Sequence, residues 1–425
     1  MGEKIDFDLI GRLKRMEAIE NPYQRFSLTR NPFPRSAIAD PHSAEFFSRS
    51  RKEALEHVRE FVLYSYRSKK WAGLIISGEY GYGKSHILFY VFDEINKQLG
   101  NLDKDRAIAI YIEHPKDTIN ELYSDFIEQI GRDRFMDYVA KTLEKYLLES
   151  LERFTYSKPL TPEEGSMDSV RKLKELGNRL IPSKKNIAWE TFARDIVSKN
   201  IILHRDFAKC LAVMMTEHDP ILVNSAWNFL IGKRTGRREA KILGLLSEMA
   251  SEDEIIKYVF PSVINILNNN DISMIFLLLD ELEKIAPKPK QAAFEFLENM
   301  RSLIDNNLRH FSMIMSCVSE AWEILQGLSP GLVERISEVT ELKPLSNLEA
   351  QILTEDFLGL ARKKGFSGDA FAPFTRDSLD EINHISKGSV RYILENCHII
   401  LESASIDENI DRTIDRDYVM KVLRG

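Results

Sequence analysis

The chain has 425 residues, of which 44% are hydrophobic and 29% charged, and its formal net charge is −7. These proportions are typical of a globular protein of two to four domains, and the negative charge disfavours a polyanion-binding surface over the whole chain. No apolar run approaches the length of a membrane span. The charged N-terminus lacks a secretion signal and the three cysteines lie far apart, so we expect a cytoplasmic protein with no membrane partner.

Residues 1–70 precede the first predicted buried strand, and we expect them to form an N-terminal helical arm. The pattern predicts an amphipathic helix at its start and a second helix near 52–68. An Asn-Pro-Phe-Pro turn at 31–34 lies between them.

The most informative motif follows a short apolar strand predicted at 71–77. Residues 78–85, GEYGYGKS, fit the phosphate-binding pattern G-x-x-x-x-G-K-[ST], and a helix is predicted over 85–95. Glycines let backbone N–H groups surround a β-phosphate, while Lys84 reaches the β/γ oxygens and Ser85 ligates Mg²⁺. We therefore expect ATP or GTP to bind here. The predicted nucleotide-binding residues are Gly78, Glu79, Tyr80, Gly81, Tyr82, Gly83, Lys84, Ser85 and His86.

A strand is predicted at 107–113, but the second half of a nucleotide site begins only near 273. We interpret 118–255 as an insertion that carries partner-specific function, because helical patterning dominates it. Helices are predicted at 169–180, 189–198, 205–217 and 221–231, and a loop at 157–166.

Five cations gather near the end of this insertion. Such a cluster can neutralise nucleic-acid phosphates, and it is also typical of a solvated helix start. The cations are Lys233, Arg234, Arg237, Arg238 and Lys241.

A continuous apolar strand predicted at 273–279 ends in Asp280 and Glu281. Asp280 is placed to hold the Mg²⁺ shell, and Glu281 to polarise the attacking water as a general base. The same pattern alone also fits an ordinary strand that ends in a polar turn. With a phosphate loop upstream, the acidic pair favours hydrolysis.

A helix predicted at 291–307 leads to another buried strand at 311–319. Either Ser316 or Ser319, near its end, is expected to contact the γ-phosphate or the water, and the spacing does not choose between them. Arg335 precedes a short apolar strand at 339–342. In ring-forming ATPases an arginine there reaches the neighbour's nucleotide; the alternative is a surface ion pair with Glu334 or Glu338.

Helical patterns continue from 346 to the end of the chain, with a final helix at 414–420. Residues 387–391, KGSVR, open an amphipathic helix. The glycine permits the turn, and Arg391 in the first helical turn suits contact with phosphates from a lid. The alternative for Arg391 is a solvent-facing position.

The order of these elements resembles that of an AAA+ ATPase, and residues 332–346 resemble the origin-recognition and Cdc6-type branch. Three segments resemble BrxD-type ATP-binding proteins of BREX phage-defence systems: GEYGYGKSH at 78–86, DELEKI at 280–285 and AWNFLIG at 226–232. The resemblance covers the core, about half of the chain, and the insertion only thinly.

This resemblance implies an α/β fold with a RecA-like three-layer αβα core and a parallel sheet. The core would comprise 71–117 and 256–345, followed by a helical lid at 346–425. Arg391 is implied as the second sensor and Arg335 as the arginine finger. The chain departs from the family at the first sensor, where it offers Ser316 in place of the common Thr or Asn. It also ends soon after the lid, so a winged helix for origin recognition is not expected.

The expected function is that of an AAA+ ATPase which uses ATP and Mg²⁺, forms homo-oligomers, and remodels or regulates a nucleic-acid or protein complex. The resemblance adds a role in phage defence. Two alternatives remain: a nucleotide-dependent switch or scaffold with incidental hydrolysis, and a replication-initiator-like DNA-binding ATPase. Stimulation of turnover by a partner distinguishes the first alternative from a motor.

Overall fold

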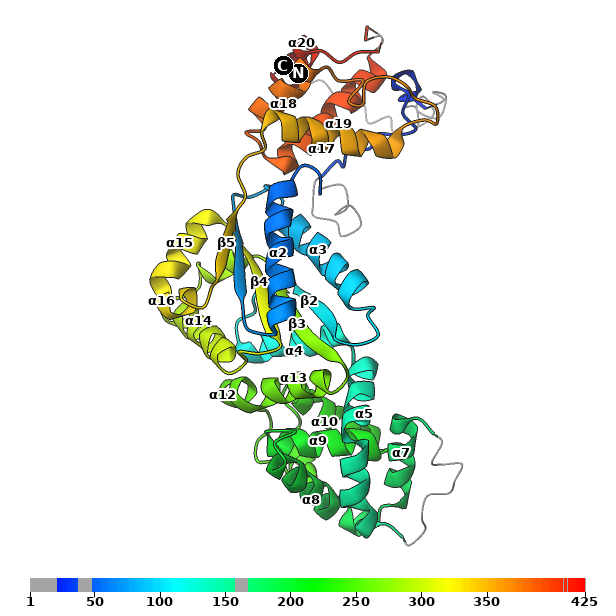
Figure 1. The fold of residues 1–425 in the computed structure, drawn as a ribbon, viewed down its shortest axis with the longest axis vertical. Helices are drawn as coiled ribbons and strands as arrows, with labels where there is room; N and C mark the ends of the chain where they lie inside the picture. The colour runs from blue at the N-terminus through cyan, green and yellow to red at the C-terminus, as the bar shows by residue number, and fades with distance from the viewer. Residues whose placement is uncertain (1–20, 37–47, 157–166, 408, 411, 425) are drawn as a thin grey trace, which may run out of the picture. The chain divides into compact units, whose positions relative to one another are not determined.

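The computed structural model describes residues 21–36, 48–156, 167–407, 409–410 and 412–424 (Figure 1). The amphipathic helix predicted at the start of the chain and the loop predicted at 157–166 lie outside these residues. The chain forms two compact units. The loop–lid unit comprises Met1–Glu56, Gly78–Tyr90 and Glu341–Gly425, and the sheet unit comprises His57–Ser77 and Val91–Thr340.

A five-stranded sheet has the strand order β2-β3-β4-β1-β5, and the pairs β2/β3, β3/β4 and β4/β1 are parallel. Every residue of β3 and β4 is buried, as expected for apolar strands covered on both faces. The predicted α/β class with a parallel sheet is confirmed. The strands are β1 (Gly73–Ser77), β2 (Arg106–Ile112), β3 (Ile272–Leu279), β4 (Phe311–Cys317) and β5 (Glu338–Glu341).

Helices cover both faces of the sheet, because the chain crosses from β1 to the edge strand β2 and then returns through β3 and β4. Right-handed crossovers put the helices of these two directions on opposite faces. On one face, Phe92 of α3 packs against Tyr111 of β2 with ring centroids 6.5 Å apart. On the other, α4, α13 and α14 enclose Leu277 of β3 (Figure 1). The bounds are α3 (Lys84–Glu94), α4 (Ile119–Ile130), α13 (Phe260–Asn268) and α14 (Lys290–Asp305).

The region predicted as an insertion is helical. Every residue of α9 after Arg205 is buried, so this helix forms the centre around which its neighbours pack. The helix α4, which falls inside the predicted range 118–255, packs directly on β2 and belongs to the layer over the sheet. The helices that follow it are α5 (Arg132–Leu151), α7 (Ser169–Arg179), α8 (Lys185–Ser198), α9 (Arg205–Thr216), α10 (Pro220–Leu230) and α11 (Arg237–Leu243).

Shorter or peripheral elements complete the sheet unit. Their bounds are η3 (Ile95–Leu99), η4 (Glu152–Phe154), η5 (Pro182–Lys184), α12 (Glu252–Glu254), η6 (Ile255–Val259), η7 (Leu282–Ile285), α15 (Ser319–Leu328) and α16 (Pro330–Val333). None of the helices in the described part of the chain has the length and apolar character needed to cross a lipid bilayer.

The loop–lid unit has its own apolar core, built mainly by four helices, α17 (Asn347–Ala361), α18 (Arg376–Ile385), α19 (Val390–Ile406) and α20 (Arg416–Arg424). Phe26 of η1 (Gln24–Phe26), Leu28 and Phe33 are buried in the same core. The Phe33 ring stacks 6.0 Å from that of Phe357. Residues 21–36, which lie in the N-terminal helical arm predicted over 1–70, therefore pack with the C-terminal helices. Their aromatic side chains complete this core. The remaining helix is α2 (Lys52–Ser68).

Candidate functional site

The phosphate-loop motif folds as a tight turn between β1 and α3. Gly81 and Gly83 have φ values of 78° and 97°, which L side chains rarely adopt. A Cβ atom on Gly81 would lie 2.7 Å from Ser389 Oγ. Both the backbone conformation and the close packing therefore require glycine at position 81.

Lys84 is the first residue of α3, and only 7% of its surface is exposed. Its ammonium group donates to the Gly78 carbonyl at 2.8 Å and to the Glu79 carbonyl at 3.2 Å. It also lies 5.5 Å from the centroid of the Tyr80 ring. Contact with phosphate oxygens would replace these carbonyl partners. Ser85 follows in the first turn, where the unpaired N–H groups of a helix favour an anion.

The predicted lid arginine meets this loop. The backbone N–H of Arg391 donates to the Gly81 carbonyl at 3.2 Å, and Ser389 Oγ donates to the same carbonyl at 3.5 Å. A Cβ on Gly81 would also lie 3.0 Å from Arg391 Cβ. The start of α19 is thus hydrogen-bonded to the loop, while the Arg391 side chain is exposed.

Arg51 is a second basic residue at the loop, and the sequence analysis missed it. The guanidinium donates to the Tyr82 carbonyl at 3.0 Å and to the Lys343 carbonyl at 2.7 Å. No motif marks position 51, because its partners are backbone atoms far away in the sequence.

The acidic half of the motif lies at the carboxyl end of β3. Asp280 is 2% exposed, and its Oδ2 accepts a hydrogen bond from the Tyr111 hydroxyl at 2.9 Å. Its Oδ1 accepts from Ser316 Oγ and from the Glu281 backbone N–H at 2.9 Å. Of the two serines that the sequence left open, Ser316 is the one held against the acidic pair, whereas Ser319 begins α15.

The sequence analysis also missed Tyr111. The pairing of β2 with β3, the strand that ends just before Asp280, is the feature that could have indicated it. Tyr111 lies opposite Leu278 in the register of β2 and β3, so a side chain on this face reaches the end of β3. Burial, reinforced by the charge of Asp280, raises the pKa of the Tyr111 phenol well above its usual value. The phenol therefore remains a donor to Asp280 over the whole physiological pH range.

Glu281 adopts a left-handed conformation with φ 51°. Its backbone N–H donates to Ser316 Oγ at 3.2 Å, and its carboxylate pairs with Lys284 at 2.5 Å. The same pair raises the pKa of Lys284. At this left-handed residue the chain turns away from the line of β3. The Glu281 carboxylate therefore lies beside η7, where Lys284 pairs with it.

The donor set at Asp280 fits Mg²⁺ better than a metal with an all-protein ligand sphere. Within the described residues, no group of three or more His, Cys, Asp or Glu side chains could hold a metal ion. Three of about four lone-pair sites of the Asp280 carboxylate already accept hydrogen bonds. Mg²⁺ commonly uses one or two carboxylates, waters and substrate phosphates, which is compatible with the one remaining site of Asp280.

Arg335, the candidate finger, is engaged within its own unit. Its Nε lies 2.7 Å and its Nη2 3.3 Å from the Asp305 carboxylate, and Nη1 lies 3.6 Å from Glu334. The hydrogen bond with Asp305, more than the Coulomb attraction, raises the pKa of Arg335. Of the two acidic partners that the sequence suggested for Arg335, Glu334 is within ion-pair distance. Asp305, which the sequence did not suggest, lies closer to the guanidinium.

The basic cluster of the insertion divides into two parts. Lys233 pairs with Glu128, and Arg234 lies 3.8 Å from Glu248. The other three cations, all exposed, have no ion pair among the described residues. They are Arg237, Arg238 and Lys241, on α11.

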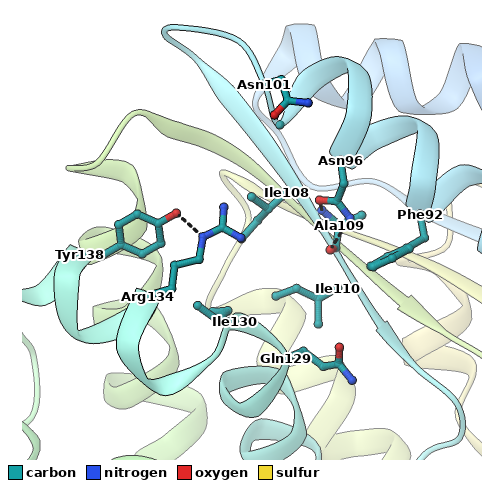
Figure 2. A pocket seen from close by; sticks show the side chains of 11 residues that line it. Phe92, Asn96, Asn101, Ile108, Ala109, Ile110, Gln129, Ile130, Arg134 and Tyr138 are labelled. Atoms are coloured by element: carbon teal, nitrogen blue, oxygen red, sulfur yellow. Dashed lines mark hydrogen bonds between the residues drawn. The ribbon is translucent and has the colours of Figure 1, made fainter.

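A pocket of about 250 Å³ lies beside the edge strand β2 (Figure 2). Asn96 closes part of the strand edge, because its side chain both donates to the Ala109 carbonyl and accepts from the Ala109 N–H, each at 3.1 Å. Arg134 Nε donates to the Tyr138 hydroxyl at 2.8 Å on the opposite wall. The pocket contains no paired acid and base or nucleophile, so its lining offers binding contacts and no catalytic group.

Comparisons with known proteins gave only a distant structural likeness. No family model matches the chain, and no curated protein matches it. The Aeropyrum pernix ORC2 protein in its ADPNP–ADP complexes is 10% identical with a TM-score of 0.43, over 88% of this chain and 67% of that one. The ADP form of the same protein gives 10% identity and a TM-score of 0.42, over 95% and 72%. TM-scores below 0.5 transfer neither a site nor a function, which must be inferred from this chain's own residues.

Proposed function

We propose that the chain is an AAA+ ATPase that binds ATP with Mg²⁺ and uses hydrolysis to remodel or regulate a nucleic-acid or protein complex. The observation that carries this proposal is the loop at 78–85, which joins a buried parallel strand to the helix that Lys84 begins and in which Gly81 and Gly83 take positive φ. This combination of strand, glycine turn and lysine at a helix start supplies what a triphosphate needs.

Each candidate residue has a role that its contacts support. Lys84 exchanges the Gly78 and Glu79 carbonyls for β/γ oxygens, and Arg391 lies on the helix that holds Gly81. Bound Mg²⁺ would neutralise charge on those oxygens, with Ser85 and Asp280 as its protein ligands.

Glu281 acts as the general base on the attacking water once it is released from Lys284, and Ser316 fixes both acidic residues. Arg335 stabilises transition-state charge in a neighbouring protomer of a homo-oligomer after it leaves Asp305. Turnover on this scheme needs two ion pairs to open, and a partner or a second protomer is the means of opening them.

The same two ion pairs favour one alternative, a nucleotide-dependent switch or scaffold in which hydrolysis is incidental. The exposed cations Arg237, Arg238 and Lys241 favour another, a DNA-binding ATPase of the replication-initiator type. The three short segments that resemble BrxD-type proteins support phage defence as the setting of either activity.

The deciding experiment measures ATP turnover per protomer over a range of protein concentrations, with and without double-stranded DNA. A specific rate that rises with concentration, and further with DNA, is the expected result for an assembled motor. A slow rate that neither concentration nor DNA changes contradicts it and favours the switch, for which a protein partner would then be sought.

A further inference from the structure

Arg51 is buried beside the phosphate loop in an unusual way. Only 5% of its surface is exposed, and its two hydrogen bonds go to backbone carbonyls, those of Tyr82 and Lys343. Its Nε atom is buried without a hydrogen-bond partner. Arg51 therefore lies between the loop and the segment that connects β5 to α17.

The charge of Arg51 has no close counter-ion in the part of the chain that the structure describes. Within the described residues, no carboxylate lies within ion-pair distance of it, whereas Arg49, two residues earlier, pairs with both Asp356 and Glu355. The carboxylate that acts on Arg51 from a distance belongs to Glu349, which is bound in a capping box with Ser346. Burial lowers the pKa of Arg51 to about 10, so the side chain remains a cation at neutral pH.

A buried charge without a partner is costly, and such charges are normally paired or bind an anion. The anion that would lie nearest is a phosphate group held by the loop, whose Tyr82 carbonyl Arg51 already binds. The loop also packs on the connecting segment, because a Cβ at Gly78 would lie 3.0 Å from Leu342. Loss of the hydrogen bonds of Arg51 to Tyr82 and Lys343 would therefore loosen the phosphate loop, whose backbone N–H groups would bind the phosphate.

We propose that Arg51 is a positioning residue of the phosphate loop, which fixes the Tyr82 carbonyl against Lys343 and supplies a positive charge that a bound polyphosphate compensates. This inference rests on the proposed nucleotide binding. The proposal gives the N-terminal segment a role in ligand binding. The Arg51 side chain connects the loop to the start of the lid, because it binds one carbonyl of each.

The test compares Arg51→Gln, which keeps one donor but removes the charge, with Arg51→Lys, which keeps the charge. The matched control is Arg362→Gln, since the hydrogen bonds of Arg362 to other described residues also go to backbone carbonyls, those of Phe26, Ala370 and Ala372, in the same unit. Dissociation constants for ATP and for inorganic tripolyphosphate are measured by calorimetry on the full chain, together with the unfolding temperature without ligand.

We expect Arg51→Gln to weaken both ligands by roughly tenfold or more, about 1.4 kcal/mol, and Arg51→Lys to weaken them less. Arg362→Gln should lower the unfolding temperature but leave both affinities within about twofold. A purely structural role of Arg51 predicts equal losses in the Gln and Lys variants, and that result, or unchanged affinities in Arg51→Gln, overturns the inference. If the unsubstituted chain binds neither ligand, the proposed function itself fails, which is a separate outcome.

Discussion

Asp280 is held by donors from two neighbouring strands and from the residue that follows it. Tyr111 and Ser316 come from the strands on either side of β3, and Glu281 donates through its backbone. This arrangement fixes the Asp280 carboxylate through three hydrogen bonds, while the Glu281 carboxylate pairs with Lys284. The two acids thus differ in how many groups hold them, which is consistent with the roles proposed for them, a metal ligand for Asp280 and a general base for Glu281.

Substitution of Lys84 and Glu281 should separate binding from turnover. Lys84→Ala should abolish ATP binding, because it removes the cation that is proposed to contact the phosphates. Glu281→Gln should retain ATP binding but lower turnover by about 10²–10⁴-fold, the usual contribution of a general base. Calorimetry and a phosphate-release assay measure the two quantities. Normal turnover in Glu281→Gln would remove Glu281 from this role.

The raised pKa of Tyr111 predicts a pH dependence of stability. Its pKa is raised above the usual value of 10.0, chiefly by burial. The stabilising contribution is complete below pH 10 and is lost as the pH rises, because the unfolded chain then releases a proton that the folded chain retains. Tyr111→Phe should therefore flatten the fall in unfolding free energy above about pH 10.

Denaturant titrations at several pH values from 8 to about 11 measure this slope. The control is Tyr64→Phe, because Tyr64 is 60% exposed and its substitution should leave the slope unchanged. An equal slope in Tyr111→Phe and the unsubstituted protein would show that the hydroxyl of Tyr111 has no such role.

At the scale of elements, the phosphate loop and α19 form one packed structure. Ser389 and Arg391 both contact Gly81, and Gly388 with φ 69° allows the chain to turn into α19 just before them. A movement of the start of α19 would therefore change the loop directly. If a nucleotide binds the loop as proposed, this contact gives a physical route by which it would influence the C-terminal helices.

Gly81→Ala tests this contact. A Cβ at this position meets both a positive φ and Ser389 Oγ at 2.7 Å, so we expect a loss of stability of about 1–3 kcal/mol and weaker ATP binding. Gly359→Ala is the control: Gly359 is helical, and a Cβ there would meet nothing within 4 Å. It should raise stability by up to about 1 kcal/mol and leave ATP affinity unchanged. Thermal unfolding and calorimetry report both effects, and equal behaviour of the two variants would contradict the packing argument.

At the scale of the whole molecule, the proposed function depends on partners. Arg335→Ala should lower turnover by about 10³-fold at protein concentrations that favour assembly, with little change in the ATP dissociation constant. Arg301→Ala is the control, since Arg301 pairs with Glu298 in the same ion-pair cluster and lies 3.8 Å from Asp305. Similar turnover in the two variants would leave Arg335 with its ion pair to Asp305 as its only role.

Binding to DNA, if it occurs through α11, should depend on salt. Reversal of charge at Arg237 and Arg238 should weaken binding to double-stranded DNA and reduce the slope of log affinity against log salt by about 1 for each lost phosphate contact. The control reverses Lys104 and Arg194, which are exposed cations elsewhere in the sheet unit. Fluorescence anisotropy at several salt concentrations gives the slopes. Equal slopes in both double variants would exclude α11 as the interface.

The amino-acid sequence by itself determined the parallel strands, the glycine loop with Lys84, and the acidic pair after β3. These features depend on local apolar runs and on residues adjacent in the chain, which are readable without tertiary contacts. The insertion helices α7 to α10 were also predictable from periodicity. In contrast, the packing of Phe33 on the C-terminal helices depends on residues more than 300 positions away.

Only the tertiary structure decided which side chains contact these motifs. The choice of Ser316 over Ser319, the donor role of Tyr111, and the contact of Asp305 with Arg335 follow from strand register and helix packing. Arg51 is the clearest case, because its partners are main-chain carbonyls, which every residue possesses and which no sequence pattern can mark. The physical reason is general: backbone and side-chain partners that are distant in sequence become neighbours only when the chain has folded.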